Sequence, residues 1–407
     1  MTKEVIRFEN RKFWRSKKTI AVIPLVVIAL LGMVQFNVRK DRSYWQESGE
    51  LSQEHTLVLS EYYKVKAELT AAELSAPEDT ETLAKLKDHY EFFNTQPLFI
   101  YQQELIGRNY TQEKAEKRLE LDIKRDQHLL AGLEEKGYAF LAETPAGVRQ
   151  RLAVNQYLFQ EKIVPLHSPY EMTAINFLYQ LLSYPWILIV LIALALLNID
   201  MFSRETDGGA YKLLYSQPFQ RHKIYWVKYI VHSLNSFFVI TALILLVFAL
   251  VALANGLGDP RYPILYYGQT FHGLGTVTPA EASVNTFTFL PWSAYLLRAL
   301  PLYILFVFLT ITITGTASLL LNNTANVSSF AIVLLFLDII FRALFAAQSK
   351  FYLFWPFTAS DINSVLRGSY PLSAAAYLIE EGILTFILYF AGLAHLQKRD
   401  LSGGIDL

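Results

Sequence analysis

The chain has 407 residues, of which 53% are hydrophobic and 14% aromatic, and its formal net charge is zero. A soluble domain of this length is rarely so apolar, so the composition favours a membrane protein. The absence of Cys excludes disulfides, thiol nucleophiles and iron–sulfur clusters.

The N-terminal residues 1–18 mix basic and apolar side chains, a pattern typical of a helix lying on the cytoplasmic membrane surface. The apolar stretch 19–36 follows directly. A cleaved signal peptide is the alternative interpretation of these residues. No small-x-small cleavage site follows the stretch, so we expect an uncleaved anchor.

Six apolar stretches are long enough to cross a bilayer, which takes about 20 helical residues. Each is expected to be helical, because lipid offers no partners for free N–H and C=O groups. The predicted fold is therefore an all-α membrane protein with six transmembrane helices. The spans are residues 19–36, 177–199, 230–254, 295–321, 327–345 and 374–396.

Residues 37–175 separate the first two spans and carry much of the charge of the chain, which predicts a helical extracytoplasmic domain. Glu61 to Leu74 and Glu113 to Glu135 are rich in helix-forming residues. One buried helix face is expected at Leu119, Ile123, Leu129, Leu130 and Leu133, and helix boundaries at Pro77, Pro97, Pro145 and Pro165.

The orientation follows from Lys and Arg, which favour the cytoplasmic side in short loops. The N-terminus, residues 200–229 and the C-terminal end are richer in these bases than the loops near 255–294 and 346–373. Both termini are therefore expected in the cytoplasm.

The polar stretch 200–229 is the most distinctive segment. Gly208 and Gly209 permit a sharp entry into a surface helix. Tyr211, Leu214 and Tyr215 would share one face of this helix, and Pro218 would end it. An amphipathic loop that only anchors the chain at the interface is the alternative.

The order of residues in this stretch resembles the cytoplasmic loop of ABC-2 type transporter permeases. The matching residues are Arg204, Glu205, Gly209, Leu213, Leu214, Pro218, Arg221 and Lys228. The Glu205-to-Gly209 spacing is slightly loose, and the insertion at 37–175 resembles the sodium- and peptide-export branch. The resemblance implies a coupling helix that docks on a separate ATPase, through Arg204, Glu205, Gly208, Gly209, Tyr211, Leu214, Tyr215, Pro218 and Arg221.

The resemblance further implies the permease subunit of an ATP-driven exporter, multi-pass in a bacterial cell membrane. The subunit would form a homodimer, or a heterodimer with a homologous permease. ATP and Mg would sit on the partner ABC ATPase, with no cofactor in this chain and no nucleic-acid partner. The substrate would be hydrophobic or amphipathic: a peptide such as an antimicrobial peptide, a lipid or a drug.

The chain lacks a G-x-x-x-x-G-K-[ST] loop, so we do not expect it to hydrolyse ATP. Leu401-Ser402-Gly403-Gly404 matches the start of the ABC ATPase signature, but without that loop we interpret the match as coincidence.

Five charged residues fall within predicted spans: Arg298, Asp338, Arg342, Glu380 and Glu381. They predict a polar patch lining an outward path, with local ion pairs or snorkelling as the alternative. In ABC-2 permeases the loop matching 346–373 forms short re-entrant helices that plug the path. An interfacial belt is the alternative for its aromatic residues.

Two other functions stay open at this point. A membrane-bound enzyme of lipid or cell-wall metabolism would need an acid–base pair or a metal site, and the His residues show no HExxH spacing. We assign no catalytic and no metal-binding residue. A sensor with an extracytoplasmic ligand-binding domain would need a cytoplasmic output domain, and the predicted cytoplasmic segments are short.

Overall fold

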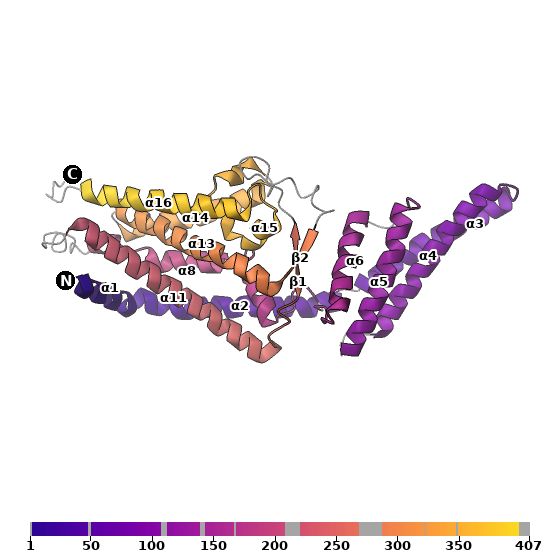
Figure 1. The fold of residues 1–407 in the computed structure, drawn as a ribbon, viewed down its shortest axis with the longest axis horizontal. Helices are drawn as coiled ribbons and strands as arrows, with labels where there is room; N and C mark the ends of the chain where they lie inside the picture. Colours follow the sequence, from indigo (N-terminus) through magenta and orange to yellow (C-terminus); the bar gives the residue numbers. More distant parts are fainter. Residues whose placement is uncertain are drawn as a thin grey trace.

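The computed structural model describes residues 2–47, 50–106, 112–138, 143–166, 168–207, 220–267, 287–321, 323–346 and 349–398. The fold is mostly helical, as predicted. A long bundle and a separate group of four helices, α3 to α6, lie end to end (Figure 1). Helix α1 (Thr2–Arg15) and the last turns of α16 lie at the end of the bundle farthest from α3 to α6.

Five helices of the described residues are long and apolar enough to cross a membrane. They cover five of the six predicted spans, and two of them extend beyond the predicted limits by nine residues or more. Helix α2 continues into the region predicted as a separate domain, and α11 already begins at Arg221, within the predicted loop. The five are α2 (Lys17–Glu47), α11 (Arg221–Asn255), α13 (Trp292–Leu320), α14 (Thr324–Leu344) and α16 (Ala374–Lys398).

The predicted span 177–199 is not one helix, and this prediction is wrong in detail. It is divided into α7 (Ala174–Leu181) and α8 (Leu188–Asn198). Pro185 lies between them and lacks the N–H that a continuous helix needs. The backbone of the break is satisfied from elsewhere in the chain: Asn363 donates to Tyr179 O at 2.6 Å, and Tyr184 N–H donates to Asp361 at 3.3 Å. Irregular backbone is tolerated among membrane helices where protein groups supply such partners.

The four-helix group contains both predicted helices of residues 37–175. Its bounds are α3 (Glu50–Ser75), α4 (Thr80–Ile106), α5 (Gln112–Glu134) and α6 (Pro145–Gln160). Pro97 lies inside α4 rather than at a boundary, so that prediction is wrong. Helix α4 packs between α3 and α5, and such packing stabilises a helix beyond its local propensity. The group has its own core, which includes Val58, Phe92, Phe93, Leu129 and Val148.

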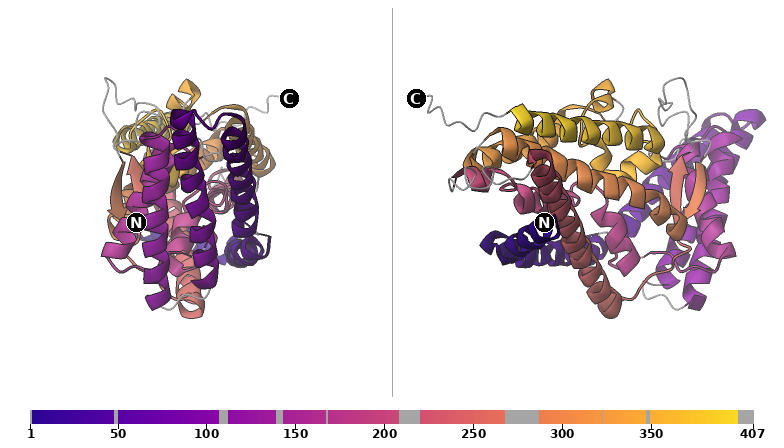
Figure 2. Two further views of the ribbon diagram at one scale, coloured as in Figure 1. Left: turned by 90° about the vertical axis from the view of Figure 1, so that its right-hand side faces the viewer. Right: turned by 60° about the vertical axis from the view of Figure 1, so that its left-hand side comes forward.

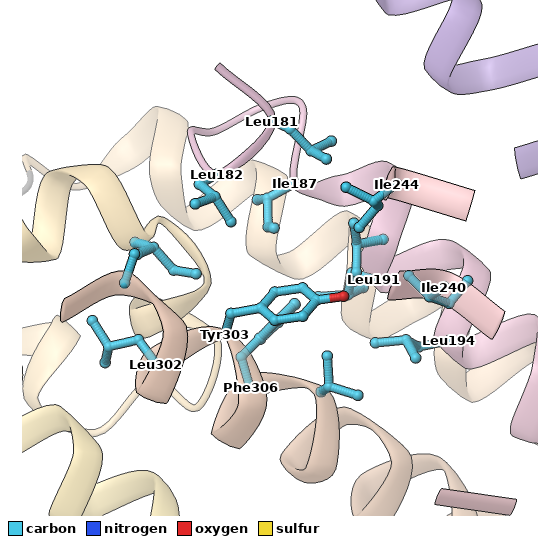
Figure 3. Close-up of a cluster of buried hydrophobic side chains, with 14 of the residues drawn as sticks. Leu181, Leu182, Ile187, Leu191, Leu194, Ile240, Ile244, Leu302, Tyr303 and Phe306 are labelled. Carbon is cyan, nitrogen blue, oxygen red and sulfur yellow. The ribbon is translucent and has the colours of Figure 1, made fainter. Parts of the chain in front are cut away.

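The core of the bundle joins the broken helix to its neighbours. Figure 3 shows the Tyr303 ring of α13 among apolar side chains of α8 and α11. Its hydroxyl group lies 3.3 Å from Thr241 Oγ1 of α11. Close packing of this kind holds helices together in lipid, where burial from water contributes little. The core therefore fixes α8 against α11 and α13, so that the segment following α8 starts from a defined position.

Two smaller features lie toward the end of the bundle that carries the four-helix group (Figure 2). Strands β1 (Pro263–Tyr267) and β2 (Phe287–Pro291) form an antiparallel pair, which the sequence analysis did not predict. Residues 346–373 contain three short helical segments, η1 (Lys350–Leu353), η2 (Thr358–Ser360) and α15 (Ile362–Arg367). Their apolar side chains Tyr352, Ile362 and Val365 are buried.

Candidate functional site

The distinctive polar stretch begins in the short helix α9 (Ser203–Asp207), which directly follows α8. Two backbone N–H groups, of Phe202 and Ser203, each donate to Ser318 Oγ of α13 at 2.9 Å. Asp207 accepts from the backbone N–H of Thr324, the first residue of α14, at 3.1 Å. These bonds fix α9 to two long helices and determine where Glu205 lies.

Glu205 lies between two lysines from different helices. Lys12 of α1 donates to its carboxylate at 2.7 Å, and Lys228 of α11 forms a close ion pair with the same oxygen. Lys228 is 0% exposed, and its ammonium is 3.9 Å from Glu9 of α1. We call Glu9, Lys12, Glu205 and Lys228 the charge cluster. Two acids and two bases from three elements balance one another, which a buried charge requires.

Burial alone would hinder ionisation of Glu205. Lys228 and Lys12 outweigh that effect and lower the pKa of the Glu205 carboxyl group below its ordinary value. The Glu205 carboxylate is therefore ionised at neutral pH.

Further contacts hold α1 against α11. Trp14 Nε1 donates to Asn235 at 3.2 Å, and Asn235 donates to Asn10 at 2.8 Å. Phe13 packs edge-on against the buried ring of His232, with centroids 5.5 Å apart. The second half of α1 is thus attached to α11, and α9 is attached to both through Glu205.

The structure places the predicted coupling residues in three groups. Glu205 is 8% exposed and faces the chain's own lysines, so it is not an exposed docking residue. Arg204 is exposed, and Arg221 begins α11 and donates to Gln397 O of α16 at 3.2 Å. The remaining six, Gly208, Gly209, Tyr211, Leu214, Tyr215 and Pro218, lie outside the described residues.

Glu9 and Lys12 also belong to the cluster, although the sequence alone did not single them out. The sequence feature that could have identified them is an acid and a base three residues apart on one helix. It lies within a run of bases that is typical of a membrane-surface helix.

The predicted polar patch contains one strong ion pair. Arg342 Nε donates to Asp338 at 3.0 Å, both on α14, and Asp338 is fully buried. Trp355 Nε1 donates to the other Asp338 oxygen at 2.7 Å. Arg342 also donates to Tyr370 Oη at 2.5 Å and to Phe357 O at 2.7 Å. The pair therefore fastens residues 346–373 to α14, which corresponds to the local ion-pair alternative.

The other three charged residues of the predicted patch differ from this pair in exposure and in hydrogen bonding. Arg298 is exposed on α13. Glu381 of α16 is 3% exposed, and neither of its oxygens has a hydrogen-bond partner among the described residues. Glu380 beside it is half-buried, and one of its oxygens also has no hydrogen-bond partner among these residues. An uncompensated carboxyl group inside a bundle is costly, so these two acids are the least stabilised part of the patch.

The comparison with known families gives one match. The sequence profile of the ABC-2 family transporter proteins matches residues 4–401, nearly the whole chain. The match includes the charge cluster, the broken helix and the Asp338–Arg342 pair. No curated protein matches the chain.

Proposed function

The chain belongs to the ABC-2 family transporter proteins, and from this membership we propose that it is the membrane-spanning subunit of an ATP-driven exporter. A separate ABC ATPase subunit binds ATP and Mg. The chain crosses a bacterial cell membrane six times, with α7 and α8 together forming the second crossing. Both termini and the charge cluster lie in the cytoplasm, and α3 to α6 lie outside.

The observation that carries the proposal is the position of Glu205 between Lys12 and Lys228. Residues 208–219 follow α9 in the sequence and dock on the ATPase. A movement of these residues is passed to α9, and Glu205 passes it on to α1 and α11. The three elements move together, because separating them would leave the buried Lys228 charge without a partner, at a cost of several kcal/mol. Glu205 is then a transmitting residue rather than a docking residue.

At the other end of the bundle, the segment 346–373 acts as the gate. Its short helices are buried in the bundle, where Asn363 and Asp361 support the break between α7 and α8. The Asp338–Arg342 pair holds the segment in this closed position. Two copies, or this chain with a homologous permease, enclose a path for a hydrophobic or amphipathic substrate.

The test is co-expression with a stand-alone ABC ATPase encoded beside this chain, followed by ATP turnover in nanodiscs. The wild-type chain should copurify with the ATPase and change its turnover. Glu205→Gln should copurify as well, with the change in turnover lost. Glu81→Gln, at an exposed acid of α4, is the matched control and should behave as wild type. An ATPase that neither copurifies nor responds would contradict the proposal.

A further inference from the structure

A cavity of about 500 Å³ lies where the bundle meets the four-helix group. It is bounded by α6, residues 162–176, β1 and the first residue of α13. Ligand pockets in proteins range from about 300 to 1,000 Å³ and are mostly apolar with a few polar groups. The lining follows this pattern, with apolar contributions from Val154, Leu166, Ile175, Tyr179, Tyr262 and Trp292. The transport mechanism proposed above does not use this cavity.

Strand β1 meets the cavity along an edge. Pro263, Ile264 and Leu265 all line it, although the side chains of successive strand residues point to opposite faces. Three successive lining residues therefore mean that the backbone itself borders the cavity.

The register shows which backbone groups this edge presents. Trp292 N–H donates to Tyr262 O at 3.1 Å, so these residues form a hydrogen-bonded pair. Such pairs alternate along antiparallel strands, which makes Ile264–Leu290 the next one. Leu265, the residue after Ile264, stands opposite Phe289 in a non-hydrogen-bonded pair and so directs its N–H and C=O away from β2. Within the described part of the chain the sheet has only two strands, so this edge meets no third strand.

One side-chain donor at the cavity also has no hydrogen-bond acceptor. Trp292 is 9% exposed and lines the cavity, and its indole N–H has no acceptor among the described residues. A buried donor without an acceptor is unfavourable, and a ligand carbonyl group would supply the missing hydrogen bond.

The charges at the cavity are of both signs. Lys162 and Arg367 line it together with Glu171 and Asp259, and Asp259 is paired with Arg261 at 2.9 Å. An anionic lipid headgroup would favour an excess of bases. A lipid tail would offer neither donor nor acceptor to the strand edge. An extended peptide offers both, with apolar side chains on its faces.

We propose that this cavity binds an extended apolar peptide segment, which pairs with the outer edge of β1 through Leu265 and accepts a hydrogen bond from Trp292. Addition of a strand to an exposed sheet edge is a recurrent mode of peptide recognition. The inference goes beyond the transport role, since binding needs neither ATP nor the ATPase. Its failure would therefore leave the proposed function untouched, and the reverse also holds.

The test compares two probes on the purified full-length chain in nanodiscs by isothermal calorimetry. One is an acetylated and amidated pentapeptide of alternating Val and Thr, and the other is the same peptide methylated at every backbone nitrogen. The methylated peptide keeps its side chains but cannot donate to a strand edge. We expect the first to bind and the second to bind at least about tenfold more weakly, the effect of losing one or two hydrogen bonds.

Two variants locate the site. Leu265→Pro removes the N–H of the outer edge, where proline is tolerated, and should weaken binding of the unmethylated peptide about tenfold. Leu265→Ala keeps that N–H and should bind within about threefold of wild type. If Leu265→Pro does not fold, the two peptides on the unaltered chain still decide. Three outcomes would overturn the proposal. These are equal binding of the two peptides, no binding of the unmethylated peptide, and its complete displacement by dodecylphosphocholine.

Discussion

Lys228 is the residue on which the charge cluster depends, because its ammonium group is buried and its ion-pair partners are the carboxylates of Glu205 and Glu9. We predict that Glu205→Gln lowers the stability of the chain by about 3 kcal/mol or more, since it leaves a buried charge poorly compensated. Thermal unfolding in detergent measures the effect. Adding Lys228→Met to Glu205→Gln should restore much of the loss. An unchanged melting temperature in the single variant would show that Lys228 reaches water.

The substitution Glu205→Lys should destabilise the chain more than Glu205→Gln does. If Glu205 acted only in docking on the ATPase, this substitution would uncouple transport while leaving the bundle folded. The structure places the new lysine beside Lys12 and Lys228, so we now expect poor expression rather than a folded, uncoupled protein.

The pH dependence of the cluster follows from the lowered pKa of Glu205. A carboxyl group with a lowered pKa stabilises the folded state above its ordinary, unfolded pKa, and this stabilisation is lost as the pH falls through the lowered value. The difference in melting temperature between wild type and Glu205→Gln should therefore be constant around neutral pH and shrink in acid. A difference that grows on acidification would contradict this assignment of charge.

Exchanging Asp338 and Arg342 tests whether the pair depends on the residues around it. A simple pair could be exchanged, but here Trp355 donates to the acid, and Phe357 O accepts from the base. We predict that Asp338→Arg with Arg342→Asp fails to restore the expression lost in the single variants. Asp338→Asn, which keeps an acceptor for Trp355, should be milder than Asp338→Ala. Expression levels and melting temperatures of these five variants decide. Full rescue by the exchange would mean that Trp355 and Phe357 do not contact the pair as described.

Helix α16 lies close to both α11 and α13 at Gly392. A Cβ atom there would lie 2.6 Å from the Tyr225 hydroxyl, which is held by a hydrogen bond to Tyr389 O. We predict that Gly392→Ala destabilises the bundle by about 1–3 kcal/mol, the usual cost of overpacking. Gly382→Ala in the same helix is the matched control, because its Cβ would meet only Leu305 at 3.9 Å. Equal melting temperatures for the two variants would place α16 farther from α11.

The elements differ in how far the sequence predicts them. Long apolar runs mark α2, α11, α13, α14 and α16 directly, since each needs only its own residues to satisfy its backbone. The break between α7 and α8 could not be predicted in this way. It depends on Asn363 and Asp361, which are distant in sequence and reach the break only after folding.

The same limit applies to the candidate site. The acid Glu205 and the later Lys228 belong to a local pattern that sequence can match to a family. Their partners on α1 are far away in the sequence: Lys12 is 193 residues from Glu205, and Glu9 is 219 residues from Lys228. The pairing follows from how α1 packs against α11, which no local pattern contains.

At the scale of the whole molecule, the charge cluster and the four-helix group lie at opposite ends of the bundle (Figure 1). The account requires that the membrane separate these ends, with the cluster facing the ATPase. The absence of Cys makes this testable, because each introduced Cys would be the only thiol in the chain.

The most direct measurement places single Cys residues at Ser75 in α3 and at His222 in the first turn of α11, both exposed. Intact cells are treated with a membrane-impermeant thiol reagent, and permeabilised cells serve as the control for reactivity. We predict labelling at position 75 in intact cells and labelling at position 222 only after permeabilisation. Labelling at 222 but not at 75 in intact cells, or labelling at both, would contradict the account.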